Sequence, residues 1–270
     1  MEKSRLDTLV HDRGLAPTRE KARALILAGK VVVNGNRVDK PGTKVPVDAN
    51  VAVLEGGLPY VSRGGLKLEG AIRDFGLSFT GKRVLDVGAS TGGFTDCALQ
   101  HGALLVVALD VGYGQLDWRL RNHERVLVKE KTNIRNFSLE DLGEPVDIVT
   151  IDVSFISLGK VLPAVSSLVR EGGEIVALVK PQFEAGRDQV GKKGVVRSRE
   201  THNHVILKVI ESAVGLGLSV RGVTYSPLTG PEGNIEYFLY LVKDGQGQAV
   251  AARDIERVVE NAHRQLGDTG

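Results

Sequence analysis

The sequence predicts an α/β fold, in which a Rossmann-like, seven-stranded and mainly parallel sheet follows a small α+β domain. From about residue 62, short runs of β-branched residues alternate with helical segments, which is typical of parallel strands joined by crossover helices. The last two runs lie close together without a long helix between them, so the final strand should be antiparallel. A glycine-rich turn follows the first run, as in nucleotide-binding folds. The expected strands cover residues 82–89, 104–111, 125–130, 146–153, 174–181, 219–226 and 236–243.

The N-terminal residues predict two short helices followed by small strands. The first helix should end at Gly14, and the second should be capped by Thr18 and closed by Gly29. An Asn34-Gly35 pair within VVVNGNRV is a strong signal for a β-hairpin. Helices of the larger domain are expected around residues 64–75, 92–101, 157–170 and 199–216, with an amphipathic segment over 250–266.

The composition indicates a two-domain protein without a membrane segment. The 270 residues are 42% hydrophobic, and the breaker-rich segment EGGLPY suggests domains at residues 1–58 and 59–270. The single cysteine, Cys97, excludes an internal disulfide and suits a reducing compartment. The N-terminus lacks an apolar leader, and no run of about eighteen apolar residues occurs. We therefore expect a cytoplasmic protein, monomeric in solution, with no membrane partner.

The charge is unevenly divided along the chain. Residues 1–44 hold ten Lys or Arg against five Asp or Glu, although the formal charge of the whole chain is only +2. A basic domain suggests a polyanionic partner such as RNA, although charged faces are more often only solvated. A second basic stretch, residues 181–198, follows a strand at the place where open α/β sheets bind ligands. The candidate RNA-binding residues are Arg5, Arg19, Lys21, Arg23, Lys192, Lys193 and Arg197, with Arg199 beside them.

The turn from Asp86 to Gly93 favours S-adenosylmethionine over a dinucleotide. A dinucleotide turn needs glycine where this chain has Ser90, so that the backbone can approach a pyrophosphate. Asp86 would repel phosphate, but its charge suits a sulfonium and an amino group. Asp110 ends the next strand, where an acid can accept hydrogen bonds from ribose hydroxyls, and Glu130 ends the third strand near the expected adenine. The candidate cofactor residues are Asp86, Gly88, Ala89, Ser90, Gly92, Gly93, Phe94, Asp110, Glu130 and Asp152.

Four further polar residues form a candidate catalytic group. Asp152 and Lys180 end two strands, Glu236 begins the last strand, and Lys67 lies in the helix that enters the larger domain. Because the carboxyl ends of parallel strands meet at one edge of a sheet, Asp152 and Lys180 should be neighbours. The alternative is a pair of structural salt bridges.

Several longer motifs resemble one protein family. VSRGGLKLEGA, LDVGASTGGFTD, TNIR, IDVSFISL, LVKPQFE and GNIEYF occur in the order typical of TlyA-type proteins, which are known both as hemolysins and as ribosomal RNA 2′-O-methyltransferases. The N-terminal domain resembles the S-four-type RNA-binding domain of ribosomal proteins. The resemblance covers nearly the whole chain, but LPY stands where some relatives have an Arg-aromatic linker, and the sequence does not specify whether this linker senses RNA.

The resemblance implies a fold and a reaction. The fold would be the seven-stranded S-adenosylmethionine-dependent methyltransferase fold of FtsJ-like enzymes, whose Lys-Asp-Lys-Glu tetrad falls on Lys67, Asp152, Lys180 and Glu236. The reaction would transfer a methyl group to a ribose 2′-hydroxyl of ribosomal RNA. A ribose hydroxyl must lose its proton as it attacks, and we expect Lys180 to accept it. Asp152 and Glu236 would then orient the amine and the hydroxyl.

Alternative functions are less compatible with these residues. A base N-methyltransferase would need two prolines where the chain has Asp152-Val153-Ser154-Phe155, and a cytosine C5 enzyme would need a nucleophilic cysteine, whereas Cys97 follows the cofactor turn in a helix. No metal is expected, because His202 and His204 lie on different faces of a helix. A membrane-active hemolysin and a non-catalytic ribosome-assembly factor remain alternatives. The nucleotide and the subunit modified are not specified by the sequence.

Overall fold

The computed structural model describes residues 2–27, 29–33, 36–54, 59–191, 194–230, 232–246 and 250–266. The chain forms two compact units, residues 1–63 and 64–270. This division falls a few residues after the boundary expected from the sequence.

The N-terminal unit packs two helices against short strands. Its apolar core includes Leu6, Val10, Ala22, Ile26 and Val31. As expected, the side chain of Thr18 accepts a hydrogen bond from the amide of Lys21, and Gly29 has a positive φ of 64° after the second helix. The Asn34-Gly35 turn lies outside the described residues, but the strands on either side of it pair antiparallel. The elements are β1 (Lys3–Arg5), α1 (Leu6–Asp12), α2 (Arg19–Leu27), β2 (Val31–Val33), β3 (Asn36–Arg37), β4 (Lys44–Pro46) and β5 (Val51–Val53).

The second unit contains the predicted seven-stranded sheet, with strand order β11-β12-β10-β9-β6-β7-β8. The final strand, β12, lies between β10 and β11 and is antiparallel to both, as the close spacing of the last two sequence runs predicted. The strands are β6 (Arg83–Val87), β7 (Leu105–Leu109), β8 (Val126–Lys129), β9 (Val146–Ile151), β10 (Val169–Val179), β11 (Ser219–Tyr225) and β12 (Tyr237–Val242).

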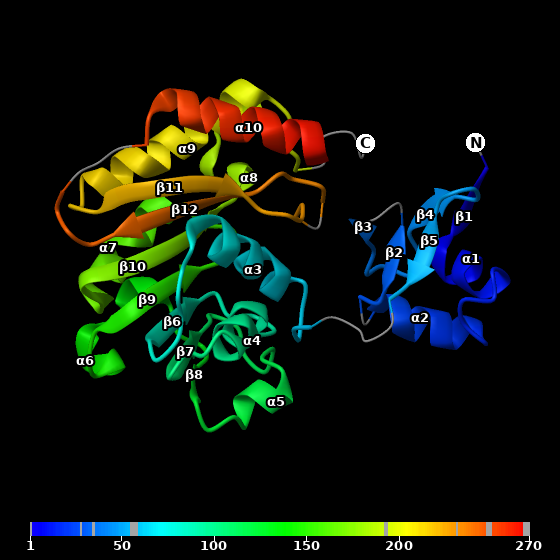
Figure 1. Cartoon of the computed structure of the whole chain (residues 1–270), viewed down its shortest axis with the longest axis horizontal. Coiled ribbons are helices and arrows are strands. Elements are labelled where there is room, and N and C mark those ends of the chain that lie inside the picture. The colour runs from blue at the N-terminus through cyan, green and yellow to red at the C-terminus, as the bar shows by residue number, and fades with distance from the viewer. Residues whose placement is uncertain are drawn as a thin grey trace. The chain divides into compact units, whose positions relative to one another are not determined.

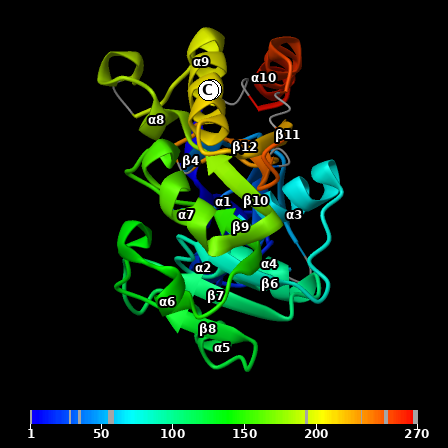
Figure 2. The same ribbon diagram turned by 90° about the vertical axis from the view of Figure 1, so that its left-hand side faces the viewer.

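Helices cover both faces of this sheet (Figures 1 and 2). α3 and α4 pack on one face, whereas α7, α9 and α10 contribute to the large apolar core on the other. The helices are α3 (Gly64–Phe75), α4 (Gly93–Gln100), α5 (Trp118–Arg121), α6 (Leu139–Leu142), α7 (Leu162–Leu168), α8 (Pro181–Glu184), α9 (Arg199–Val214) and α10 (Ala252–Leu266), with short 3₁₀ turns η1 (Ile134–Asn136), η2 (Leu158–Lys160) and η3 (Arg187–Gln189).

One helix differs from the prediction. The segment expected as a single helix over residues 157–170 is divided into η2 and α7, and β10 already begins at Val169. Pro163 at the start of α7 lacks an amide hydrogen and so favours a new helix start there. Val169 pairs with Val146, whereas Glu174 pairs with Ile148, so the intervening residues form a bulge that periodicity alone does not reveal.

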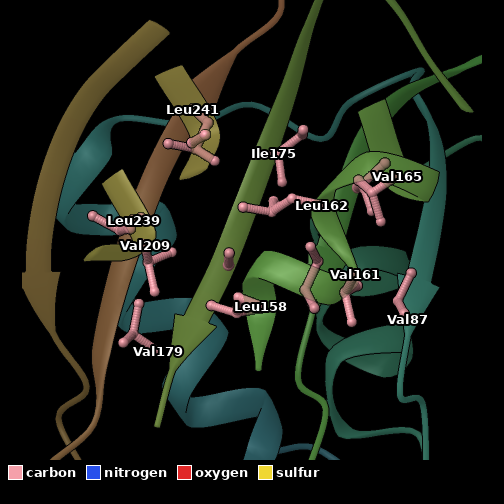
Figure 3. Close-up of a cluster of buried hydrophobic side chains, with 14 of the residues drawn as sticks. Val87, Leu158, Val161, Leu162, Val165, Ile175, Val179, Val209, Leu239 and Leu241 are labelled. Carbon is pink, nitrogen blue, oxygen red and sulfur yellow. The ribbon is translucent and has the colours of Figure 1, made fainter. Parts of the chain in front are cut away.

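The core on the α7 side anchors the segment that follows β9. Leu158, Val161, Leu162 and Val165 are almost fully buried against the sheet (Figure 3), together with Val87, Ile175, Val179, Val209, Leu239 and Leu241. Burying each such side chain contributes about 1.5–3 kcal/mol relative to leaving it exposed. The buried residues from Leu158 onward therefore fix the position of the polar residues that directly precede them.

Candidate active site

Four strand ends meet at one edge of the sheet. Val87 is the partner of Ile151, and the amide of Asp152 donates a hydrogen bond to the carbonyl of Val87 at 2.9 Å. On the other side, Val179 is the partner of Tyr237 in the antiparallel β10–β12 pair. This register places Asp152, Lys180 and Glu236 directly beyond the paired residues of three adjacent strands.

The glycine-rich turn lies against the end of β9. Gly88 has a φ of 86°, and a Cβ atom there would lie 2.5 Å from the carbonyl oxygen of Asp152. Gly92 has a φ of 95° and similarly faces the side chain of Leu120. Both positions therefore require glycine, for its backbone conformation and for its lack of a side chain. Ser90 is also left-handed, with a φ of 48°.

The turn continues directly into α4. Gly92 donates its amide hydrogen to the carbonyl of Ala89 at 2.7 Å, and Gly93 is the first residue of α4. Phe94 is buried, and its ring centroid lies 6.1 Å from that of Phe238. The backbone from Gly88 to Gly93 thus forms a fixed strand-turn-helix connection at the carboxyl edge of the sheet.

Asp86 supports this turn from inside the protein. Its carboxylate is completely buried and accepts hydrogen bonds from the hydroxyls of Thr95 at 2.6 Å and Thr150 at 3.0 Å. Burial raises the pKa of Asp86 to about 7, although the two hydroxyls oppose that shift. The carboxylate connects β6, β9 and α4 beneath the turn.

Asp110 and Glu130 lie at the ends of the next two strands. Asp110 accepts a hydrogen bond from the amide of Ser90 at 2.8 Å, which joins the end of β7 to the glycine-rich turn, and another from Gly112 at 2.6 Å. Glu130 is paired with Arg121 and accepts from the amide of Gly114 at 2.9 Å. Arg121 is the main reason that the pKa of Glu130 lies below its usual value.

The four candidate catalytic residues form two ion pairs. Nζ of Lys67 lies 2.6 Å from Oε2 of Glu236, and both side chains are buried, at 7% and 1% exposure. Nζ of Lys180 lies 2.6 Å from Oδ1 of Asp152 and donates a hydrogen bond to Oγ of Ser154 at 2.9 Å. Lys180 thus links Asp152 and Ser154 at the end of β9 to the end of β10.

Ser154 and Phe155 are site residues that the sequence did not identify. Phe155 has a positive φ of 63°, and its side chain is 90% exposed. Its ring centroid lies 5.0 Å from that of Phe183, which follows Lys180 on α8. The only available signal was the motif IDVSFISL, in which a large apolar residue follows a strand end without belonging to an apolar stripe.

The predicted RNA-binding side chains of the N-terminal unit are exposed or half-exposed. Arg5 and Arg19 both contact the buried carboxylate of Asp7, with Arg5 bound through two nitrogens at 3.0 and 2.9 Å and Arg19 at 3.3 Å. Lys21 and Arg23 face solvent on α2. In the second unit Arg197 is exposed, whereas Lys192 and Lys193 lie outside the described residues.

The two histidines of α9 have different environments. His202 is buried and its Nδ1 atom lies 2.8 Å from the hydroxyl of Tyr237, whereas His204 is exposed. Cys97 is buried in α4. In the parts of the chain that the structure describes, no three His, Cys, Asp or Glu residues are grouped as a metal site would require. No helix within those same parts has the length and apolar character needed to cross a membrane.

Family comparisons agree with the fold. Residues 60–243 match the FtsJ-like methyltransferase family, and residues 4–51 match the S4 domain. The fold and the site therefore define an FtsJ-like methyltransferase unit joined to an S4 domain, as the sequence motifs predicted.

Full-length relatives identify the family more closely. The chain is 50% identical to "Putative rRNA methyltransferase YqxC" of Bacillus subtilis, over 98% of this chain and 96% of the relative. It is 46% identical to "16S/23S rRNA (cytidine-2′-O)-methyltransferase TlyA" of Mycobacterium tuberculosis, over 96% of this chain and 97% of that protein. The solved structure "Putative hemolysin from Streptococcus thermophilus" is 46% identical, covers 99% of this chain and 98% of its own, and has a TM-score of 0.79. The chain belongs to the TlyA family.

Proposed function

We propose that this protein transfers a methyl group from S-adenosyl-L-methionine to a ribose 2′-hydroxyl of ribosomal RNA. The observation that carries the proposal is the position of the Lys180–Asp152 pair. Asp152 pairs with Lys180 through its carboxylate. The backbone carbonyl of Asp152 faces Gly88, where a Cβ atom would lie only 2.5 Å from it. A candidate proton acceptor is thus held next to the glycine-rich turn that would bind the methyl donor.

The residues around the turn fit this cofactor. Gly88 lets the turn pack directly against the end of β9, and Asp110 retains lone pairs that can accept hydrogen bonds from ribose hydroxyls. Glu130 would lie toward the adenine, and Asp152 would lie next to the turn. The cofactor would supply an electrophilic methyl group on a positively charged sulfur.

The proposed chemistry assigns a role to each ion pair. Lys180 would accept the proton of the ribose hydroxyl as its oxygen bonds to the methyl carbon, while the carbon–sulfur bond of the cofactor breaks and the neutral thioether leaves. Asp152 and Ser154 would hold the amine of Lys180 in place. Glu236, which pairs with Lys67 at 2.6 Å, would help to orient the ribose hydroxyl.

Recognition of RNA is assigned to both units. The S4 domain would contact phosphates through Arg5, Arg19, Lys21 and Arg23. In the second unit, Arg197 would contact RNA together with Lys192 and Lys193, which lie outside the described residues. Phe155 offers an exposed aromatic face close to Lys180, on which the base of the target nucleotide could stack. With ribosomal RNA as the proposed substrate, the proposed place of action is the cytoplasm.

The test is transfer of radiolabelled methyl groups from S-adenosyl-L-methionine to ribosomal RNA and to ribosomal subunits. The wild-type protein should label at least one of these substrates. Lys180→Ala should bind the cofactor but transfer no label, whereas Lys160→Ala, which changes an exposed lysine on η2, should behave as wild type. Cofactor binding without labelling of any ribosomal substrate would reject the proposal and favour a non-catalytic assembly factor.

A further inference from the structure

Two segments at the active site are connected by several contacts besides the sheet itself. The first, residues 152–158, follows β9, and the second, residues 180–184, follows β10. Lys180 contacts both Asp152 and Ser154, and the rings of Phe155 and Phe183 lie 5.0 Å apart. At the far end, Glu184 contacts Ser157 and Leu158. The first segment is therefore held by contacts on both sides of Phe155, at Ser154 and at Ser157 and Leu158.

Glu184 is a buried carboxylate that serves the first segment. It is 5% exposed and accepts hydrogen bonds from Oγ of Ser157 at 2.6 Å and from the amide of Leu158 at 2.7 Å. Both donors lie at the N-terminus of η2, where backbone amides lack partners within the helix. Burial raises the pKa of Glu184, because it disfavours the charged form of the carboxyl group. The hydrogen bonds from Ser157 and Leu158 oppose this effect and stabilise the carboxylate.

The segment held in this way contains a strained residue. Phe155 adopts a left-handed backbone conformation with a φ of 63°, which costs an aromatic residue about 1–2 kcal/mol. Because its side chain is 90% exposed, burial in a core does not fix this conformation. Lys180 holds the segment on one side of Phe155 through Ser154, and Glu184 holds it on the other side through Ser157 and Leu158.

We propose that Glu184 is a positioning residue for the methyl transfer: it fixes Ser157 and Leu158, and thereby keeps Phe155 in its strained, exposed position and Ser154 on the amine of Lys180. Glu184 acts through these residues and does not itself contact the reacting atoms. The inference rests on the proposed function for its catalytic consequence, but its structural part can be tested without any activity.

The structural part is tested by hydrogen exchange in the full-length protein. In the wild type, the amide of Leu158 should be protected by the carboxylate of Glu184. Glu184→Ala and the milder Ser157→Ala should both accelerate exchange in peptides covering residues 153–160, while peptides from β9 remain protected. Glu211→Ala, an exposed glutamate on α9, serves as the control and should change neither region. Unchanged exchange of residues 153–160 in a folded Glu184→Ala variant, or in Ser157→Ala where Glu184→Ala fails to fold, would overturn the proposal.

The catalytic part is tested by steady-state kinetics. Glu184→Ala should lower kcat for methyl transfer by about tenfold to a hundredfold, because small displacements of catalytic groups have effects of that size, and leave the cofactor Kd within about twofold. Glu184→Gln should restore much of the rate, because its amide oxygen can accept from Leu158 and its nitrogen can donate to Ser157. In a Phe155→Ala background, Glu184→Ala should lower kcat by a smaller factor than in the wild type, since both changes affect the same segment.

These results separate the inference from the proposed function. A normal kcat in variants whose 153–160 segment exchanges faster would contradict the positioning role. The role would also be contradicted if the free-energy effects of Glu184→Ala and Phe155→Ala on kcat were simply additive in the double variant. Absence of transfer by the wild type, with the exchange results as predicted, would reject the proposed function while leaving the structural role of Glu184 supported.

Discussion

Lys67 and Glu236, which are 169 positions apart in the chain, form a buried ion pair with 2.6 Å between Nζ and Oε2. Lys67 lies on α3, on one face of the sheet, and Glu236 directly precedes β12. Each of these buried charges is stabilised by the opposite charge of the other. Loss of one side chain therefore leaves the other charge buried without this ionic partner.

Removal of Glu236 should therefore destabilise the protein strongly. Glu236→Ala is expected to lower the free energy of unfolding by about 3–5 kcal/mol, whereas the double variant Lys67→Met/Glu236→Leu should recover most of that loss without recovering methyl transfer. Denaturant unfolding measures the first effect, and labelling of RNA the second. As a control, Asp254→Ala removes the partner of the exposed Arg257 and should change stability by less than about 1 kcal/mol. A Glu236→Ala variant as stable as the control would contradict the buried-pair account.

Gly88 should be essential for cofactor binding. In Gly88→Ala, the new Cβ would lie 2.5 Å from the carbonyl oxygen of Asp152 and the backbone would remain at a positive φ, so the turn must shift. We expect binding of S-adenosyl-L-methionine, measured by calorimetry, to be lost. Gly81→Ala is the matched control, because Gly81 also has a positive φ, but a Cβ atom there would meet no atom of the described residues within 4 Å. It should cost about 1 kcal/mol of stability from the backbone alone and leave binding intact.

His202 should make stability depend on pH. Burial and the neighbouring His263 lower the pKa of His202 from 6.5 to about 4. Between those pH values the unfolded chain binds a proton that the folded chain does not, so this residue's contribution is present above pH 6.5 and lost as the pH falls toward 4. The size of the loss is up to roughly 3 kcal/mol.

The measurement must separate His202 from Asp86, whose raised pKa has the opposite effect over much of this range. The free energies of unfolding of wild type and His202→Gln should therefore be compared at several pH values. The advantage of the wild type should shrink from about pH 7 to about pH 4.5. A constant difference would show that His202 does not titrate as predicted.

Asp7 should strengthen RNA binding although it is negatively charged. It orients the side chains of Arg5 and Arg19, and its pKa is lowered to about 2, mainly by Arg5. Asp7→Asn makes the S4 domain more positive but frees both guanidinium groups, so we expect RNA binding to weaken by about threefold to tenfold. Asp12→Asn adds the same charge at an exposed carboxylate and should bind RNA as well as or better than wild type. Tighter binding by Asp7→Asn in a filter-binding assay would contradict the orienting role.

The residues of the site differ in how far the sequence could predict them. Asp152 and Lys180 were predictable as neighbours, because the carboxyl ends of parallel strands meet at one edge of a sheet. Glu236 precedes the antiparallel strand β12, and its place at that edge depends on the pairing of β12 with β10. The bounds of α3 were also predicted correctly, since its helical period is regular. By contrast, the contact of Glu184 with Ser157 joins two loops, and no local pattern encodes such a contact.

Two further features could not be predicted for similar reasons. The positive φ of Phe155 contradicts the ordinary preference of an aromatic residue and exists only because neighbouring segments hold it. The burial of Asp86 against Thr95 and Thr150 depends on strand order and helix packing, so the sequence indicated an acid at the strand end but not its surroundings.

The central claim, methyl transfer to a ribose oxygen, is tested most directly by alkaline hydrolysis of RNA labelled by this protein. Alkali cleaves RNA through attack of the free 2′-hydroxyl on the adjacent phosphate, so a 2′-O-methyl group blocks cleavage at its own nucleotide. We predict that the label is recovered in alkali-resistant dinucleotides and that Lys180→Ala yields none. Recovery of the label in mononucleotides would show methylation of a base and contradict the account.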